Sequence, residues 1–434
     1  MFEFMQQSLD SAAQRAPAWL QDWLRDGRDR WEASTMPTRK TENWKYTSVQ
    51  ALREHFAPAA AGARLLRESD IDLPQLVGSR QVFINGHHSA RLSDSELPDG
   101  VSLVRFGEAS TAQAAHIRQY LGSAAGEAGT LFTALNDASL AEGVFVEIAA
   151  GHRVAQPLHL VWLTTNQGEA FSVNQRLLVL CGSDSSCAVV EQFAGVRAAN
   201  KAFSNGVSEL LLARGATLEH YRLHQEEGSD LHVGGVYARL AEQSTFNSFH
   251  LGLGSELKRI DVVVEHCGQG AHSEVNGVYL PRGSEHIDYH TCIEHRVPDC
   301  TSSETFRGII ADEARAVFNG RIHIHRDAQK TRAELSNKNL LTSTRAEVNT
   351  KPELEIYADD VQCAHGATVA QLNENALHYL RTRGVSRTEA QSMLSFGFIN
   401  EVIDTVRNAA LRDYLRAMLA RRFARDPALT RPTA

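Results

Sequence analysis

The segment that decides the fold is Arg259–Pro281, which reads RIDVVVEHCGQGAHSEVNGVYLP. Apolar and polar residues alternate in two short runs, and the small residues of CGQGA separate these runs. Alternation with a period of two is typical of a β-strand with one buried face, and a glycine-rich interruption is typical of the turn that ends it. The segment therefore predicts two strands joined by a tight turn.

Comparable segments fill the chain from about residue 143 to residue 370, and none of them has helical periodicity. Many short, evenly spaced strands indicate a sandwich, a barrel or a solenoid. The region is too long for one ordinary sandwich, and related turn sequences such as RGATLEH, GQGAHSEV and GSDSSCAVV recur along it. Recurring turns favour a β-helix, in which each turn of the chain stacks on the one before. We therefore predict a mainly β fold with a β-helix core over residues 141–370.

Residues 1–140 are expected to form an N-terminal region of mixed, largely helical structure. Apolar residues recur at helical spacing near the N-terminus, and Pro17 is expected to divide that segment into two helices. A further helix is expected over residues 47–56, which read TSVQALREHF. The pair Asn85-Gly86 between two short apolar runs is typical of a β-hairpin turn.

The C-terminal part of the chain is expected to be helical again, with a helical domain over residues 371–425 and a flexible tail over residues 426–434. Gly384 suits the end of one helix, because glycine adopts the left-handed conformation of a helix C-cap at little cost. Ser386 and Glu389 have the spacing of a capping box at the start of the next helix. These signals divide the domain into separate helices.

The composition excludes two classes of partner. The formal net charge is −8, and no segment has the clustered lysine and arginine of a nucleic-acid-binding face. No apolar run approaches the roughly 20 residues needed to span a bilayer. The N-terminal segment contains Glu3 and Asp10 and lacks an apolar signal core. A cytoplasmic protein that binds neither nucleic acid nor a membrane is therefore expected.

Several common functional motifs are missing from the sequence. There is no GxxxxGK[ST] loop, so the chain is not expected to bind or hydrolyse ATP by that route. The six cysteines include no CxxC pair, which leaves a zinc knuckle and a self-contained ferredoxin cluster without support. A carboxylate pair for sugar hydrolysis leaves no linear motif in a β-helix, so a carbohydrate-active enzyme stays an alternative.

A candidate metal site lies in Tyr357–Thr368, which reads YADDVQCAHGAT. Residues two apart in a strand face the same side, so Cys363 and His365 are expected to share one face. Both side chains are iron ligands, but iron in a cluster normally needs four. Three interpretations stay open: half of a metal site completed by a partner, a catalytic pair, or an ordinary strand end with a buried, inert thiol.

The 19 histidines crowd the second half of the chain. A single histidine on a strand is usually a half-buried residue without a special role, but the set indicates a surface with some affinity for metal. His323 and His325 alternate with Ile322 and Ile324, which indicates that the isoleucines pack inward and the histidines face outward. A free-standing, histidine-rich metal-binding protein is therefore a further alternative.

Four segments together resemble one protein family. They are TENWKYTS, NGRIHIHRDAQKT, the segment from NKNLLTSTR to CAHGAT, and the segment from LHYLRTRG to FINEVID, at residues 41–48, 319–331, 337–368 and 377–404. These sequences are similar to those of the SufB/SufD family, the scaffold subunits of the bacterial SUF system for iron–sulfur cluster assembly. The resemblance runs from about residue 35 to residue 404.

The resemblance implies a right-handed parallel β-helix core, a variable N-terminal region and a C-terminal helical domain. In this family SufB and SufD pair through the end of the β-helix, and each binds one copy of the ATPase SufC on its helical domain. ATP hydrolysis then belongs to SufC, in keeping with the missing phosphate-binding loop. The family also implies a transient iron–sulfur cluster or iron at the SufB interface. Two further questions stay open at this point: whether a flavin binds the complex, and whether the chain forms a homodimer in the absence of SufB.

Asn337 indicates the SufD branch of the family. SufB carries an essential cysteine six residues after the threonine of its DAQKT segment, and the same count from Thr331 leads here to Asn337. An asparagine cannot form the soft thiolate that anchors a nascent cluster. A SufD-like subunit is therefore expected to leave that thiolate to its partner.

The resemblance also implies roles for named residues. His365 matches a functionally important histidine of SufD and is the first candidate for an iron or cluster ligand, with Cys363 a weaker candidate beside it. The segment that includes Met393, Phe396 and Ile399 corresponds to the place where SufC docks, although their spacing alone is typical of a helix core. We therefore predict a non-enzymatic scaffold subunit of iron–sulfur cluster assembly.

Overall fold

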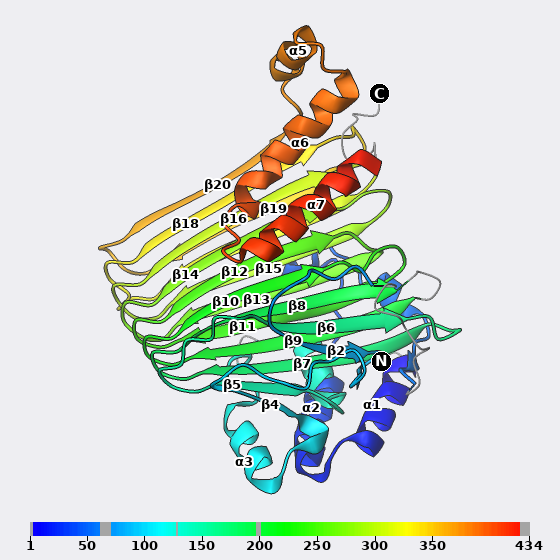
Figure 1. The fold of residues 1–434 in the computed structure, drawn as a ribbon, viewed down its shortest axis with the longest axis vertical. Helices are drawn as coiled ribbons and strands as arrows, with labels where there is room; N and C mark the ends of the chain where they lie inside the picture. The colour runs from blue at the N-terminus through cyan, green and yellow to red at the C-terminus, as the bar shows by residue number, and fades with distance from the viewer. Residues whose placement is uncertain (1–2, 61–70, 127–128, 197–200, 426–434) are drawn as a thin grey trace.

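The computed structural model describes residues 3–60, 71–126, 129–196 and 201–425. Its core is a β-solenoid of parallel strands in two sheets (Figure 1). From β5 onward the odd-numbered strands form one sheet and the even-numbered strands form the other, so each turn contributes one strand to each sheet. The mainly β fold with a solenoid core is thereby confirmed. The helices lie outside this core, and none within the described ranges is long and apolar enough to cross a membrane.

The sheet that ends in β19, hereafter the β19 sheet, has the strand order β19, β17, β15, β13, β11, β9, β7, β5, β4, and β1 pairs with β7. Its strands are β1 (Ala57–Pro58), β4 (Val101–Arg105), β5 (Val144–Ile148), β7 (Phe171–Cys181), β9 (Ala202–Leu212), β11 (Leu231–Leu240), β13 (Leu257–His266), β15 (His286–His295), β17 (Arg315–Ile324) and β19 (Glu347–Ile356).

The sheet that ends in β20, hereafter the β20 sheet, has the strand order β20, β18, β16, β14, β12, β10, β8, β6, β2, β3. Its strands are β2 (Ser79–Ile84), β3 (His87–His88), β6 (Leu158–Thr165), β8 (Ser186–Val196), β10 (Thr217–His224), β12 (Thr245–Leu253), β14 (His272–Leu280), β16 (Thr301–Ile310), β18 (Arg332–Leu341) and β20 (Gln362–Ala370).

The strands of neighbouring turns pair in register, so equivalent residues stack in columns along the solenoid. For example, His266 in β13 pairs with His295 in β15. Alternate side chains point inward and form one continuous apolar core that includes Val262, Phe306 and Ile322. Burial of each such side chain stabilises the fold by about 1.5–3 kcal/mol.

One corner of the solenoid repeats the same turn. This repeated corner comprises the turns that follow the odd-numbered strands β7 to β19. In six of these turns a residue with a left-handed backbone lies two positions before the next strand, and these residues are Asp184, Gly215, Gln243, Gly270, Asp299 and Lys330. The N–H groups of five of them, all except Gly270, donate to a carbonyl of the next corner, as from Gln243 to the Gln269 carbonyl at 3.0 Å and from Asp299 to the Gln329 carbonyl at 2.9 Å. The related turn sequences are therefore one repeated structural unit.

The N-terminal region packs on the outer face of the β19 sheet. Its helices are α1 (Glu3–Arg15), α2 (Gln21–Ala33), α3 (Thr111–Tyr120) and α4 (Leu131–Ala138), with 3-10 helices at Ala18–Leu20, Glu42–Trp44, Gln50–Arg53 and Phe106–Glu108. Trp31 of α2 belongs to the same buried cluster as Phe203 and Leu231 of the sheet. Arg176 in β7 contacts both Asp137 of α4, at 2.9 Å, and Glu209 of β9, at 2.5 Å. Apolar contacts and buried ion pairs together fix this region on the solenoid.

Two expectations for the N-terminal region are confirmed. α1 ends before Pro17 and α2 begins after it, as expected for a residue that cannot continue a helix. Asn85 and Gly86 have φ values of +51° and +81° between β2 and β3, which pair antiparallel. Two consecutive positive φ values are those of a tight hairpin turn.

The helix expected over residues 47–56 is wrong, because only the 3-10 helix Gln50–Arg53 forms there. The Thr47 hydroxyl forms hydrogen bonds with Asp288 and, at 3.0 Å, with His286 Nε2, both in β15. These bonds hold the start of the segment on the sheet. Its other end continues into β1, which needs an extended backbone. Tertiary contacts at both ends therefore override the local helical pattern.

The C-terminal helices are α5 (Glu374–Thr382), α6 (Arg387–Ile403) and α7 (Ala409–Arg425). α6 and α7 cross the outer face of the β20 sheet, whereas α5 lies beyond the last turn of the solenoid (Figure 1). Gly384 has a φ of +86° between α5 and α6. The Ser386 hydroxyl accepts a hydrogen bond from the Glu389 N–H at 3.2 Å. Both boundary signals thus lie where a helix ends or begins.

Replacing Gly270 by alanine is expected to destabilise the solenoid, because a Cβ atom makes the left-handed backbone at φ +74° unfavourable. The new Cβ would lie 3.6 Å from Gln243 Cγ, so the cost is conformational rather than steric. We expect a loss of about 1 kcal/mol and a lower melting temperature, measured by circular dichroism.

The matched control is Gly397→Ala on the exposed side of α6, where a Cβ meets no atom within 4 Å. Alanine is the better helix former, so this change should raise the melting temperature. Equal shifts for Gly270→Ala and Gly397→Ala would contradict the role of the left-handed residue at the repeated corner.

Candidate functional site

The last turn of the solenoid, formed by β19 and β20, is an open end. In the described part of the chain, β19 pairs only with β17 and β20 only with β18, so each strand has one unpaired edge. Most residues of β20 are exposed, although parallel strands are normally covered on both faces. Unpaired edges present main-chain N–H and C=O groups that can pair with another chain. The open end is therefore a surface suited to strand pairing.

Cys363 and His365 lie at the start of β20, on its inward face. Cys363 pairs with Ala333 and His365 pairs with Leu335, and both of these partners belong to the core. Cys363 is half-buried against that core, whereas His365 is exposed. Burial raises the pKa of the Cys363 thiol, so the thiol is protonated at neutral pH. The two side chains share one face, and the imidazole is the more accessible ligand.

Asn337 lies one turn earlier, inside the solenoid, and its amide group is fully engaged. Its Nδ2 donates to the Tyr279 hydroxyl at 3.0 Å, and its Oδ1 accepts from Asn339 Nδ2 at 2.6 Å and from the Thr350 hydroxyl at 2.8 Å. The Asn337 side chain is completely buried. It therefore organises the polar interior and offers no thiolate to a metal at the open end.

Glu304 lies in the same column as His365, two turns inside the open end. It pairs with Leu335 of β18, which in turn pairs with His365 of β20. Its carboxyl group is buried, and burial raises its pKa to about 8, so Glu304 is a neutral acid at pH 7. Sequence reasoning did not single out this residue. The sequence does contain one signal: Glu304 lies two residues before Phe306 in the same strand, and Phe306 packs in the core, so both side chains point inward.

Six of the histidines in the second half of the chain are buried inside the solenoid, and they are His220, His224, His232, His250, His266 and His295. Polar neighbours explain this placement. His220 Nε2 lies 3.0 Å from Glu191, and His266 Nε2 lies 2.9 Å from the Ser273 hydroxyl. Burial lowers the pKa of all six imidazoles, which favours their neutral forms. The expectation of half-buried histidines is wrong for these six.

Three groups of side chains in the described ranges bring metal-ligating atoms within 4.8 Å of one another, and they are His266 with His295 and Cys300, His224 with Glu226 and His232, and Glu294 with His323 and His325. The first two groups are buried. In the second, the Lys258 ammonium lies 3.3 Å from Glu226 and already balances its charge. In the third, the side chains of His323 and His325 are 19% and 33% exposed, so they face outward as expected.

The repeated corner gathers most of these ligands. His266 and His295 end β13 and β15, and Cys300 directly precedes β16. His325 directly follows β17, and Cys363 is the second residue of β20. Because the strands pair in register, these residues follow one edge of the solenoid as far as its open end.

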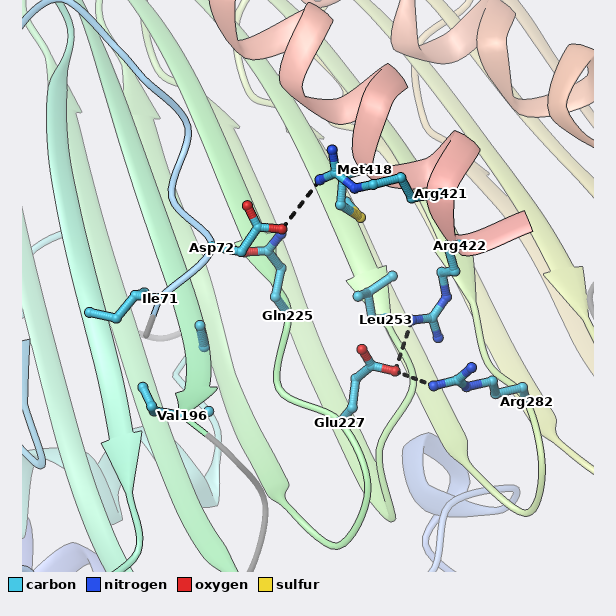
Figure 2. Close-up of a pocket in the computed structure, with 12 residues that line it drawn as sticks. Ile71, Asp72, Val196, Gln225, Glu227, Leu253, Arg282, Met418, Arg421 and Arg422 are labelled. Carbon is cyan, nitrogen blue, oxygen red and sulfur yellow. Dashed lines mark hydrogen bonds and ion pairs between the residues drawn. The ribbon is translucent and has the colours of Figure 1, made fainter. Parts of the chain in front are cut away.

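A pocket lies under α7, and the charged side chains that line it already form ion pairs with one another. Figure 2 shows Asp72, Glu227 and the side chains of Arg282, Arg421 and Arg422 around it. Glu227 lies 2.9 Å from Arg282 and 2.8 Å from Arg422, and Asp72 lies 3.4 Å from Arg421. These ion pairs fasten α7 to the turns of the β20 sheet and need no bound anion.

The residues expected in the SufC-docking segment differ in exposure. Met393 on α6 is 52% exposed, whereas Phe396 is half-buried in contact with Phe423, and Ile399 is completely buried. Phe396 and Ile399 thus belong to the core between α6, α7 and the β20 sheet. Of the three residues, Met393 is the one that a partner can reach.

Comparison with known proteins identifies the family. Residues 1–160 match the family model of the SufBD protein N-terminal region, and residues 163–398 match that of the SufBD core domain of SUF-system FeS cluster assembly. The chain belongs to the SufBD family. This membership places it in iron–sulfur cluster assembly and argues against a β-helix carbohydrate-active enzyme.

Curated relatives match over most of their length. The chain is 31% identical over 412 residues to the iron–sulfur cluster assembly protein SufD of Escherichia coli strain K12, which is 94% of this chain and 92% of that protein. It is 28% identical over 391 residues to a SufBD family protein of Synechocystis, covering 88% and 86%. It is 27% identical over 387 residues to the chloroplastic protein ABCI7 of Arabidopsis thaliana, covering 88% and 81%. The similarity therefore includes the solenoid and both flanking regions.

Glu304→Gln is expected to change the pH dependence of stability in this SufBD protein. The folded chain retains the Glu304 proton up to about pH 8, whereas an ordinary glutamate releases it near pH 4.5. Between these values the wild type loses stability as pH rises, by about 1.4 kcal/mol per pH unit from this group. Glutamine cannot ionise, so the variant lacks this loss.

Thermal melting across this pH range measures the effect. The melting temperatures of wild type and Glu304→Gln should agree near pH 4.5, and the variant should melt higher at pH 8. A difference between the two proteins that does not change with pH would contradict a neutral Glu304.

Proposed function

We propose that this chain is a SufD-like scaffold subunit of the SUF system, which pairs with SufB at the open end of its solenoid and binds the ATPase SufC through its C-terminal helices. The subunit itself performs no catalysis in this role. The observation that carries the proposal is the open end, where two unpaired strand edges and an incomplete set of soft ligands lie together.

The geometry of the open end favours a partner of the same fold. β19 and β20 each have one unpaired edge, and they belong to the two different sheets. A second solenoid that presents its own last turn can therefore extend both sheets at once and satisfy both rows of main-chain groups. SufB has that fold by family resemblance. When SufB is absent, a second copy of this chain could pair with the same two strand edges.

The ligands at the open end are incomplete without a partner. Cys363 and His365 offer one sulfur and one nitrogen, and the buried Asn337 offers no thiolate. Iron in a cluster normally has four ligands, so SufB would supply the rest, including the essential thiolate. We rank His365 first because its ring is exposed, and Cys363 second because its thiol is half-buried and protonated. The iron or nascent cluster held there is cargo of the assembly reaction.

The C-terminal helices fit a docking role for SufC. α5 and the start of α6 project beyond the body of the solenoid (Figure 1). Their exposed apolar side chains include Tyr379, which is 58% exposed, and Met393, which is 52% exposed. ATP-driven dimerisation of SufC would shift the SufB–SufD interface by binding one of its two arrangements more tightly. That shift would admit iron and sulfur to the ligands.

A co-purification experiment tests the scaffold role. The chain is co-expressed with SufB and SufC and purified through a tag on this chain. Both partners should co-elute with it. Elution of this chain without either partner would overturn the proposal.

His365→Ala is expected to lower cluster assembly in cells by at least about tenfold while SufB and SufC still co-elute, because an exposed imidazole acts as a ligand and not in packing. Cys363→Ser should lower assembly less. The activity of a cellular iron–sulfur enzyme reports the yield of assembly.

His152→Ala is the matched control, since His152 is an exposed histidine in the turn between β5 and β6, far from the open end. Normal assembly in the His365→Ala strain, with the complex intact, would remove this residue from the mechanism. A larger loss in the Cys363→Ser strain would reverse the ranking of the two ligands.

Met393→Asp is expected to weaken the binding of purified SufC by at least about tenfold and to leave SufB bound, because it places a charge on the exposed apolar surface of α6. Isothermal titration calorimetry gives the Kd. Val77→Asp is the control, since Val77 is 74% exposed and lies outside the C-terminal helices. Unchanged SufC affinity in the Met393 variant would place the docking surface elsewhere.

A further inference from the structure

We propose that Glu294, His323 and His325 form a binding site for a divalent first-row transition-metal ion on the outer surface of the solenoid. The three residues offer one carboxylate oxygen and two imidazole nitrogens. The inference goes beyond the proposed scaffold function, because the site lies within one chain and requires neither SufB nor His365. The sequence alone does not indicate this site, because the alternation of His323 and His325 with isoleucines is typical of any strand that has one buried face.

In-register pairing of two turns assembles the site. Glu294 in β15 pairs directly with His323 in β17. Both side chains point outward, because their neighbours Ile293 and Ile322 pack in the core. His325 lies in the turn after β17, and its main-chain N–H donates a hydrogen bond to the His295 carbonyl at 2.9 Å, which holds the residue in place. The turn brings its ring back over the same carboxylate.

The three ligand atoms lie close to the spacing that a metal ion requires. Glu294 Oε2 lies 2.9 Å from His323 Nδ1 and 2.7 Å from His325 Nε2, and the two imidazole centroids are 4.2 Å apart. A metal ion with bonds of about 2.1 Å holds neighbouring ligand atoms roughly 3.0–3.4 Å apart. An ion can therefore replace the two hydrogen bonds with small movements of the rings.

The charge and orientation of Glu294 suit a cation. Both imidazoles lie within hydrogen-bonding distance of its Oε2, and a carboxylate oxygen beside two imidazole nitrogens is an anionic ligand for a divalent ion. The other oxygen, Oε1, contacts the Cys292 thiol at 3.5 Å and the Arg321 guanidinium at 3.4 Å. These contacts orient the carboxylate and leave Oε2 directed at the imidazoles.

Exposure distinguishes this group from the two buried ones. The Glu294 side chain is 12% exposed, and those of His323 and His325 are 19% and 33% exposed, so an ion can enter from solvent and retain open coordination positions. In the group around Glu226 the Lys258 ammonium lies 3.3 Å from Oε2, the oxygen that faces His224, whereas at Glu294 the Arg321 guanidinium contacts Oε1 and not the Oε2 that faces the imidazoles. Two imidazoles and one carboxylate with open positions are the ligand set of many Fe²⁺ sites, and imidazole also suits Zn²⁺.

Titration of the full-length chain, alone, with Co²⁺ as a spectroscopic probe tests the site. One Co²⁺ per chain should bind with a saturable visible absorption, and Zn²⁺ should displace it. His323→Ala, His325→Ala and Glu294→Gln should each weaken Co²⁺ binding by at least about tenfold. His325 lies in a turn and is partly exposed, so its removal leaves the solenoid folded, which a melting curve verifies.

Two controls separate this site from other ligands of the chain. His290→Ala removes another outward histidine of β15, which lies 3.2 Å from Asp288 and belongs to none of the three groups of metal-ligating side chains, and Co²⁺ affinity should not change. His365→Ala should also leave Co²⁺ bound. Absence of Co²⁺ binding, unchanged binding in a folded His323→Ala/His325→Ala double variant, or loss of binding in the His290 variant would overturn the proposal. None of these outcomes depends on SufB or SufC.

Discussion

The main-chain hydrogen bonds between successive turns are the constraint on which the rest of the structure depends. They place each residue beside its counterpart in the next turn, and so every side chain belongs to a column. Glu304, Leu335 and His365 form one such column toward the open end, and Glu294 with His323 form part of another on the outer face. Which groups meet is therefore decided by register between turns.

The same stacking explains how the interior tolerates charged side chains. Glu191 in β8 lies 3.1 Å from Arg222 and 3.0 Å from His220, both in the neighbouring strand β10. Burial alone would raise the pKa of Glu191, but Arg222 and His220 lower it to about 2. At Glu304 no such cation opposes burial among the described groups, and its pKa rises instead. Whether a buried carboxyl is an ion or a neutral acid thus depends on the residue that the next turn supplies.

Local patterns explain what could be predicted from the sequence, and distant contacts explain what could not. The alternation and turn residues of Arg259–Pro281 predict the solenoid, and alternation within one strand predicts the shared face of Cys363 and His365. The segment at residues 47–56 depends instead on hydrogen bonds from Thr47 to β15, which no local pattern contains. Likewise, the buried histidines and the Glu294 group depend on register. The equal spacing of His266–His295 and Glu294–His323 is the signal in the sequence that could have indicated it.

The repeated corner also limits how such a chain can change in length during evolution. Five of the corners donate the same main-chain hydrogen bond to the next corner, so a complete turn can be gained or lost while the corners on either side still match. A single inserted residue within a strand would instead exchange the inward and outward faces for the rest of that strand. Length variation in the solenoid is therefore expected in steps of whole turns, and the helices at its two ends can be carried along as intact units.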